Sequence, residues 1–405
     1  MADQHTLRYA ARIPRGTCKL FGAIKALSTL KNSAILVHGP KGCVYHINYI
    51  LGMRGDRPSE IYSTCLDEHD VIFGAEQKLR EAIEELDQTL RPDLVFVLSC
   101  CASDIIGEDA GSAVRNSKTR SRVITISAGG FEGDFREGYS ETLCQLVKEL
   151  VKKTDTIDPR SVNLIGMLRS GPDLEELRSM LHLIDVKVNA VLTADATLED
   201  IERIGAASLN IVLCEPAGKE AAELLQATCA TPYIIEELPI GYHWGIRLLE
   251  RVAENLHLPR DSTLLNDQDH MPDYSSLKHR RIAIVSGPTR AVSLTRFFTT
   301  YCIVPRLIVV DFDRSVIEKI GSLVDSACEV LIEPDHDLIV QKLKDHSIDL
   351  LIGGMQELPL AKALGIEHID IMHGSQKTVG FAGENNLAGL LCRKVPNERR
   401  PRRKN

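Results

Sequence analysis

The sequence predicts an α/β protein made of three Rossmann-like, doubly wound units with parallel sheets. Short apolar runs rich in β-branched residues alternate along the chain with longer amphipathic stretches. Such brief, nearly continuous apolar runs are typical of strands that helices cover on both faces. Two polar joints that contain proline, Lys152–Ser161 and Leu258–Arg280, divide the chain into lengths that are ordinary for domains.

Each element is expected where the pattern is clearest. The expected strands are Ala34–Gly39, Asp93–Ser99, Arg122–Gly129, Val162–Leu168, Leu209–Cys214, Arg281–Gly287, Arg306–Asp311 and Ile348–Gly354. The stretch 76–90 predicts a helix, because Leu79, Ile83, Leu86 and Leu90 fall on one face. The expected domains are 1–155, 156–278 and 279–392, followed by a basic, flexible tail at 393–405.

Composition limits the class of protein. The chain has 405 residues, of which 44% are apolar and 26% charged, and these values are ordinary for a globular protein. No apolar run approaches the ~20 residues of a membrane helix, and the first residues lack the apolar core of a signal peptide. We therefore expect a cytoplasmic protein. The net charge of −8 argues against a generic nucleic-acid binder.

Cysteines are the most informative residues. Of the eleven, three fall in loops of the first unit: Cys18 before the first helical stretch, Cys43 after one expected strand and Cys101 after another. Ligands of parallel sheets bind at the carboxyl ends of the strands, and thiolates suit iron–sulfur clusters and zinc. The spacing is not CxxC, so a zinc ribbon is not expected. By spacing alone, three buried structural thiols are the favoured interpretation.

Three motifs change that balance. His38–Cys43 (HGPKGC), Asp70–Leu79 (DVIFGAEQKL) and Ser99–Asp109 (SCCASDIIGED) resemble segments of the nitrogenase component-1 superfamily, in the same order and spacing. The resemblance implies three α/β units with a [4Fe–4S] cluster site and a dimer interface in the first.

Carried over position by position, the cluster ligands of that superfamily fall on Cys18, Cys43 and Cys101. Cys100 stands where nitrogenase α subunits have Glu and is a less expected ligand. Cys65 is a reserve candidate. The other six cysteines lie in or beside helical or strand runs and are expected to be core thiols.

The number of ligands implies an assembly. A four-iron cluster normally takes four protein ligands, and one chain offers three. We expect a homodimer that shares one cluster at its two-fold axis; the alternative is one cluster per chain with a further ligand. The resemblance also implies a partner, a homodimeric ATP-hydrolysing reductase like the nitrogenase iron protein. The chain has no GxxxxGK[ST] phosphate loop, so ATP and Mg²⁺ are expected to act in that partner.

Within the superfamily, the stretch 45–74 most resembles the catalytic component of the nickel-sirohydrochlorin a,c-diamide reductive cyclases. Such a component would carry out the six-electron reduction and γ-lactam closure that lead to the nickel tetrapyrrole coenzyme of methanogens, factor 430. Nickel would arrive inside the substrate ring.

Candidate residues for this substrate lie close to the motifs. Lys41, Arg54 and Arg57 are candidates to bind the carboxylates of the substrate. An equally weighted alternative is that they are ordinary charges on a surface turn. Candidate proton donors are His46, Glu68, His69 and His373. For each histidine, a hydrogen-bonded structural role is the more frequent one. We expect His38 to brace the Cys43 loop.

Three other functions compete with this prediction. One is another nitrogenase-like reductase, acting on a chlorophyll precursor or on carbon–sulfur bonds. Another is a scaffold that assembles a metallocofactor without turnover. The last is a ligand-binding or regulatory α/β protein with no cluster. Iron and sulfide analysis separates the last from the others, and ATP-dependent change of the nickel tetrapyrrole separates an enzyme from a scaffold.

Overall fold

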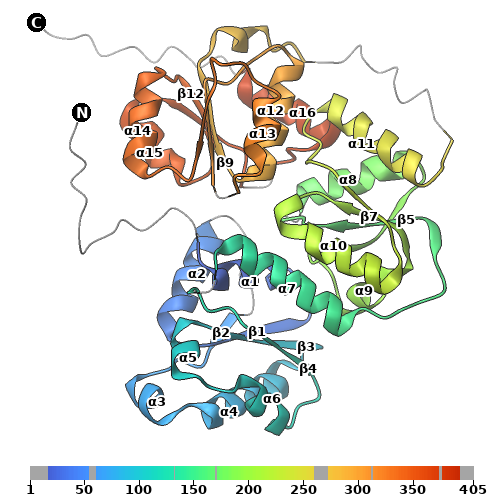
Figure 1. Cartoon of the computed structure of the whole chain (residues 1–405), viewed down its shortest axis with the longest axis vertical. Helices are drawn as coiled ribbons and strands as arrows, with labels where there is room; N and C mark the ends of the chain where they lie inside the picture. The colour runs from blue at the N-terminus through green and yellow to red at the C-terminus, as the bar shows by residue number, and fades with distance from the viewer. Residues whose placement is uncertain are drawn as a thin grey trace, which may run out of the picture.

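The computed structural model describes residues 17–53, 61–131, 133–168, 171–259, 272–311, 313–373 and 376–392. Within them the chain forms three sheets, each parallel throughout and flanked by helices (Figure 1). This confirms the predicted fold class. In the described part of the chain, no helix is long and apolar enough to cross a membrane.

The first sheet has the strand order β2-β1-β3-β4. Its strands are β1 (Ser33–His38), β2 (Ile61–Ser63), β3 (Leu94–Ser99) and β4 (Arg122–Ile126). Its helices are α1 (Lys19–Leu27), α2 (Lys41–Met53), α3 (Glu68–Phe73), α4 (Glu76–Leu90), α5 (Cys101–Ile106), α6 (Ala110–Asn116) and α7 (Phe135–Leu150). Alternate residues of β3 face opposite sides: Phe96 packs in the core with α1, α2 and α7, and Val97 packs in the core with α4 and α6.

The second sheet has the order β6-β5-β7-β8. Its strands are β5 (Asp158–Ile165), β6 (Lys187–Leu192), β7 (Ala207–Val212) and β8 (Tyr233–Ile235). The helices around it are α8 (Pro172–Leu183), α9 (Leu198–Glu202), the 3-10 turn η1 (Ile204–Ala206), α10 (Glu215–Cys229) and α11 (Tyr242–Asn255).

The third sheet has the order β11-β10-β9-β12-β13. Its strands are β9 (Ile282–Ser286), β10 (Leu307–Val310), β11 (Glu329–Ile332), β12 (Leu350–Gly353) and β13 (Glu367–Asp370). The 3-10 turn η4 (Ser275–His279) precedes it, and its helices are α12 (Pro288–Thr300), α13 (Val316–Gly321), α14 (His336–Asp345), α15 (Glu357–Leu364) and α16 (Gly380–Leu391).

The three sheets do not have separate cores. One apolar cluster joins side chains around the first and second sheets, and another joins the second and third. The last helix, α16, leaves the third sheet and packs against α8 and α11 (Figure 1). Asp173, fully buried in α8, accepts hydrogen bonds from the N–H and hydroxyl of Thr378 at 2.6 and 2.8 Å, which fixes the segment that leads into α16.

Two details differ from the expectations. The joint 152–161 is not linker throughout, because β5 begins at Asp158; Pro159 is tolerated there since the pairing of β5 is irregular between Asp158 and Val162. Cys302, expected in the core, is exposed just after α12. Arg54, Arg57, the tail 393–405 and most of the second joint (260–271) lie outside the described residues.

Candidate metal centre

The cysteines gather at the carboxyl edge of the first sheet, where β1 and β3 lie side by side. The connections leave these two strands in opposite directions, and such a switch point forms the natural ligand crevice of a doubly wound sheet. Cys43 stands in the first turn of α2, directly after β1, and Cys100 and Cys101 follow β3. Two sequence segments more than fifty residues apart thereby meet.

Cys18 reaches the same edge from the other end of the unit. It is the residue before α1, in extended backbone, and it bridges Asp134 at the start of α7. α1 lies closely against α7, because a Cβ on Gly22 or on Gly138 would lie 2.0 Å from a carbonyl oxygen of the facing helix end. These two glycines let the backbones of α1 and α7 pack closely, which fixes α1 and therefore the position of Cys18.

Neighbouring thiols shift the pKa values of Cys43 and Cys100. A hydrogen bond to Cys100, burial and the charges of Cys100, Cys18 and Cys101 raise the pKa of Cys43. The same hydrogen bond from Cys43 lowers the pKa of Cys100 to about 6; burial opposes the shift, and the N–H groups of Ser103 and Ala102 support it. Cys43 and Cys100 therefore form a hydrogen-bonded pair in which the protonation of one thiol affects that of the other.

Two glycines leave room for the sulfur atoms. A Cβ on Gly39 would lie 2.4 Å from Cys100 Sγ, and one on Gly130 would lie 3.2 Å from both Cys101 Sγ and Cys18 Cβ. The Gly130 N–H donates to Cys101 Sγ at 3.1 Å. Only a residue without a side chain fits at Gly39, and Gly130 leaves little space for one, so the backbone at both positions lies close to the thiols.

These residues fit an iron–sulfur cluster better than a single ion. Across the described ranges, no three His, Cys, Asp or Glu side chains are arranged to hold one metal ion. An iron–sulfur cluster takes thiolate ligands spread around a larger body. Cys18 is exposed and Cys43 and Cys101 are half-buried, so these three thiols can reach a group on the open side. Cys100 is 2% exposed and lies behind Gly39.

A buried network braces this loop, as expected for His38. His38 Nδ1 lies 3.0 Å from Thr64 Oγ1, and its Nε2 pairs with the Glu108 carboxylate. Thr64 Oγ1 also accepts from the Gly39 N–H at 3.1 Å. The network connects the ends of β1 and β2 with the segment after α5, which holds the Cys43 and Cys100 loops at a fixed separation.

Exposed apolar side chains surround the same end of the unit, and the sequence analysis did not identify them. We call them the apolar rim; they are Tyr45, Tyr49 and Met53 on α2, Val71, Ile72 and Phe73 on α3, Ile105 on α5, and Phe131. A signal was present, because α2 carries a second apolar row opposite its buried Val44, Ile47 and Leu51. Concentrated exposed apolar surface marks a contact site.

The remaining candidates are distributed unevenly. Lys41 and His46 are exposed on α2, the helix that carries Cys43. Glu68 and His69 are exposed on α3, where the His69 ring lies 4.6 Å from that of Phe73. His373 follows β13 in the third sheet, and its Nδ1 lies 3.0 Å from Asp370 Oδ2. This is the kind of partner expected for a histidine with a hydrogen-bonded structural role.

Cys65 differs from the other four cysteines. It is exposed after β2 in left-handed backbone (φ 52°), and its carbonyl accepts from Lys78 Nζ at 3.1 Å. Its thiol is one of the groups that raise the pKa of Lys78, after the hydrogen bond and charge of Asp70. The structure therefore groups Cys18, Cys43, Cys100 and Cys101 and leaves Cys65 linked to α4.

Comparison with known proteins identifies the family. The sequence pattern of the family described as nitrogenase component 1 type oxidoreductase matches residues 18–395. The chain belongs to this family. The superfamily expected from the three motifs is thereby confirmed, and so is the expectation of an oxidoreductase-type protein.

Relatives of two kinds match nearly the whole chain. The nitrogenase iron-molybdenum cofactor biosynthesis protein NifE of Clostridium pasteurianum is 28% identical, over 95% of this chain and 88% of its own length. The nitrogenase molybdenum-iron protein beta chain of Methanothermobacter thermautotrophicus is 25% identical, over 95% and 94%. A solved structure titled "Nitrogenase Cp1 at pH 6.5" shares the fold, with a TM-score of 0.84 at 19% identity, over 95% of this chain and 93% of that one.

Proposed function

We propose that this chain is the iron–sulfur catalytic component of a nitrogenase-like, ATP-dependent reductase. The observation that carries the proposal is the convergence of four cysteines at the switch point of the first sheet, next to the apolar rim. Cys18, Cys43 and Cys101 would hold a [4Fe–4S] cluster. When bound, the cluster would supply low-potential electrons one at a time.

The chain's own residues set the conditions of that site. The His38–Thr64–Glu108 network fixes the loop geometry. Cys100 is buried against Gly39 and hydrogen-bonded to Cys43, so it orients the Cys43 sulfur. The Gly130 N–H donates to Cys101 Sγ, which helps to fix the position of that sulfur.

The apolar rim supports a homodimer. Its side chains lie on α2, α3 and α5, the helices around the cysteine loops, so a second copy that covers them would bring two cysteine sets together. With a two-fold contact of this kind, two of the three thiolates from each copy would supply the four ligands of one shared cluster, and the third pair would be spare or weakly bound. It would also remove water from around the sulfur atoms.

The proposed substrate is nickel-sirohydrochlorin a,c-diamide, with electrons from an iron-protein-like ATPase. This finer assignment rests on the sequence resemblance of residues 45–74. Lys41 is exposed next to Cys43 and is a candidate partner for a substrate carboxylate; Arg54 and Arg57 are the other two. His46, Glu68 and His69 are exposed on the same side as the rim helices and are the candidate proton donors, with His373 the candidate from the third sheet.

A second function has its own support. Several similar proteins are named for iron–molybdenum cofactor biosynthesis, which favours a scaffold that assembles a metal cluster and transfers it. A scaffold would need the same cysteines but no tetrapyrrole chemistry. The two functions therefore share the metal site. The enzyme would release a reduced tetrapyrrole, whereas the scaffold would transfer its metal cluster.

The cluster site is tested by single Cys→Ser variants at positions 18, 43, 65, 100 and 101, with the exposed Cys302→Ser as the matched control. Each protein is loaded with iron and sulfide without oxygen, and its iron content and visible absorption are measured. We expect loss of the cluster for Cys43→Ser and for at least one of Cys18→Ser and Cys101→Ser, and retention for the control. Full iron content in all three of these variants would refute the assignment.

Turnover separates the enzyme from the scaffold. The loaded protein is incubated with the ATP-hydrolysing reductase, ATP, dithionite and the nickel tetrapyrrole, and the tetrapyrrole spectrum is followed. We expect a change that requires ATP. A loaded dimer that leaves the spectrum unchanged but transfers its iron to an acceptor protein would establish the scaffold instead.

A further inference from the structure

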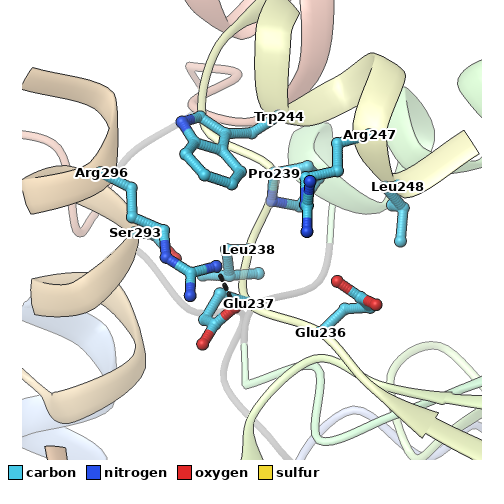
Figure 2. A pocket seen from close by; sticks show the side chains of 9 residues that line it. All are labelled: Glu236, Glu237, Leu238, Pro239, Trp244, Arg247, Leu248, Ser293 and Arg296. Atoms are coloured by element: carbon cyan, nitrogen blue, oxygen red, sulfur yellow. Dashed lines mark hydrogen bonds and ion pairs between the residues drawn. The ribbon is translucent and has the colours of Figure 1, made fainter. Parts of the chain in front are cut away.

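A second polar site lies far along the chain from the cysteines, between the second and third sheets. Six residues define it, and we call it the seam pocket: Glu236, Glu237, Trp244, Arg247, Ser293 and Arg296. Figure 2 shows them converging from the loop after β8, from α11 and from α12. This loop follows the carboxyl end of a parallel strand, the edge where doubly wound sheets bind ligands.

The two carboxylates of the seam pocket already have cationic partners. Arg296 Nη1 donates to Glu237 Oε2 at 2.5 Å (Figure 2). Lys319 Nζ lies 3.7 Å from the other oxygen of that carboxylate. Arg251 Nε donates to Glu236 Oε1 at 2.9 Å. The acidic groups are therefore compensated by cations.

The donors of the pocket are not all used. Ser293 is 2% exposed, and its hydroxyl has no hydrogen-bond partner; the buried Nε of Arg296 has none either. Within the described residues, Arg247 makes no ion pair, and its Cζ lies over the face of Trp244, 5.9 Å from the ring centroid. A buried polar group without a partner is destabilising, so a ligand that supplies the partner gains free energy there. The pocket thus presents three free donor groups, two of them cationic.

We propose that the seam pocket binds a small anionic group, a carboxylate or a phosphate. The anion would accept hydrogen bonds from the Ser293 hydroxyl and the Arg296 Nε and would form an ion pair with Arg247. In this conformation the pocket has room for little more than a water molecule, so one anionic group, free or at the end of a larger ligand, would enter as the Arg247 side chain moves outward. Arg247 is exposed at the pocket mouth and is free to swing aside for entry. Because Ser293 and Arg296 belong to α12 and Arg247 to α11, the anion would connect the second and third sheets.

The chain carries its own reporter for this site. Trp244 is the single tryptophan in the sequence, and the Arg296 guanidinium lies 5.0 Å from its ring centroid. A change in tryptophan fluorescence therefore reports on the surroundings of Trp244, and the variants test whether the anion binds in the seam pocket. The probes are inorganic phosphate and acetate, each titrated at constant ionic strength into the whole protein.

The proposal predicts a saturable fluorescence change with at least one of the two anions. Phosphate alone would identify a phosphoryl ligand, and acetate alone a carboxylate ligand. Arg247→Gln and Ser293→Ala should each weaken binding about tenfold or more, as expected for a lost hydrogen bond to a charged group. The matched control, Lys187→Gln, removes a positive charge at the start of β6, the opposite end of the second sheet, and should leave the titration unchanged.

Two outcomes would overturn the proposal. One is the absence of saturation with both anions in the unmodified protein. The other is a titration that neither Arg247→Gln nor Ser293→Ala alters, which would place the anion elsewhere. Neither result depends on the cysteines, so the seam pocket and the proposed reductase function stand or fall separately.

Discussion

Replacing Gly39 by alanine tests the packing of the cysteine site without any metal. The new Cβ would lie 2.4 Å from Cys100 Sγ, whereas such atoms ordinarily stay roughly 3.5–4.0 Å apart. The sulfur must therefore move by more than about 1 Å inside a buried loop. Overpacking of this kind costs roughly 1–3 kcal/mol, and the smaller freedom of the unfolded alanine chain offsets about 0.4–1 kcal/mol. We expect Gly39→Ala to destabilise the metal-free protein by about 1–2 kcal/mol.

Urea unfolding under reducing conditions measures this cost, and the chain offers a close control. Gly42 lies three residues on, and a Cβ there would meet no atom within 4 Å. Gly42→Ala should be neutral or slightly stabilising. Cys100→Ala supplies the rescue, because the nearest remaining Cys100 atom, its Cβ, would lie 3.4 Å from the new methyl group. In that background the cost of Gly39→Ala should fall below about 0.5 kcal/mol. Equal stability of the two glycine variants, or a cost that survives in the Cys100→Ala background, would refute the reasoning.

Two further predictions concern stability and assembly. Hydrogen bonds from Ser121 and from the Arg120 N–H hold the pKa of the buried Asp87 below its ordinary value although burial opposes the shift. Asp87→Asn should therefore lower the free energy of unfolding by about 1–3 kcal/mol at pH 7. This loss should shrink as the pH falls below about 3.9 toward the lower folded-state pKa of Asp87. Equal urea midpoints for the variant and the unmodified protein at pH 7 would contradict this. Phe73 is 72% exposed, so covering it in a dimer is worth about 3 kcal/mol. Phe73→Asp should raise the dimer Kd at least about a hundredfold in sedimentation, whereas the exposed Leu183→Asp should not.

The strands at the centres of the sheets were predictable from the sequence, and several at the edges were not. Every expected apolar run contains a strand, and all of these strands except β4 lie inside a sheet, where burial on both faces gives a continuous apolar segment. β2 and β8 have three residues each, too few for a pattern. β6 was not predicted because the polar Asn189 interrupts its apolar run. The Asn189 side chain donates to the amide oxygen of Asn163 at 2.8 Å, and the local sequence does not reveal this contact.

The same contrast holds for the site. The glycine-rich turn and the strand ends placed Cys43 and Cys101 at one edge, since parallel strands bring their carboxyl ends together. The position of Cys100 was not predictable, because sequence cannot show which of two adjacent thiols turns inward against Gly39. The seam pocket was unpredictable for another reason. Its donors come from helices about fifty residues apart, and their unused hydrogen-bonding capacity exists only once those helices pack.

The path of α16 matters for how the protein is made. The helices and strands of the first sheet all lie within the first 150 residues, so the cysteine edge can form early on the ribosome. α8 and α11 must wait, because the helix that covers them is encoded at the far end of the chain. The middle of the molecule is thus completed last, and during synthesis its apolar helix faces stay open to chaperones. A chain cut short before Gly380 would leave that surface uncovered for good and would be a target for proteolysis.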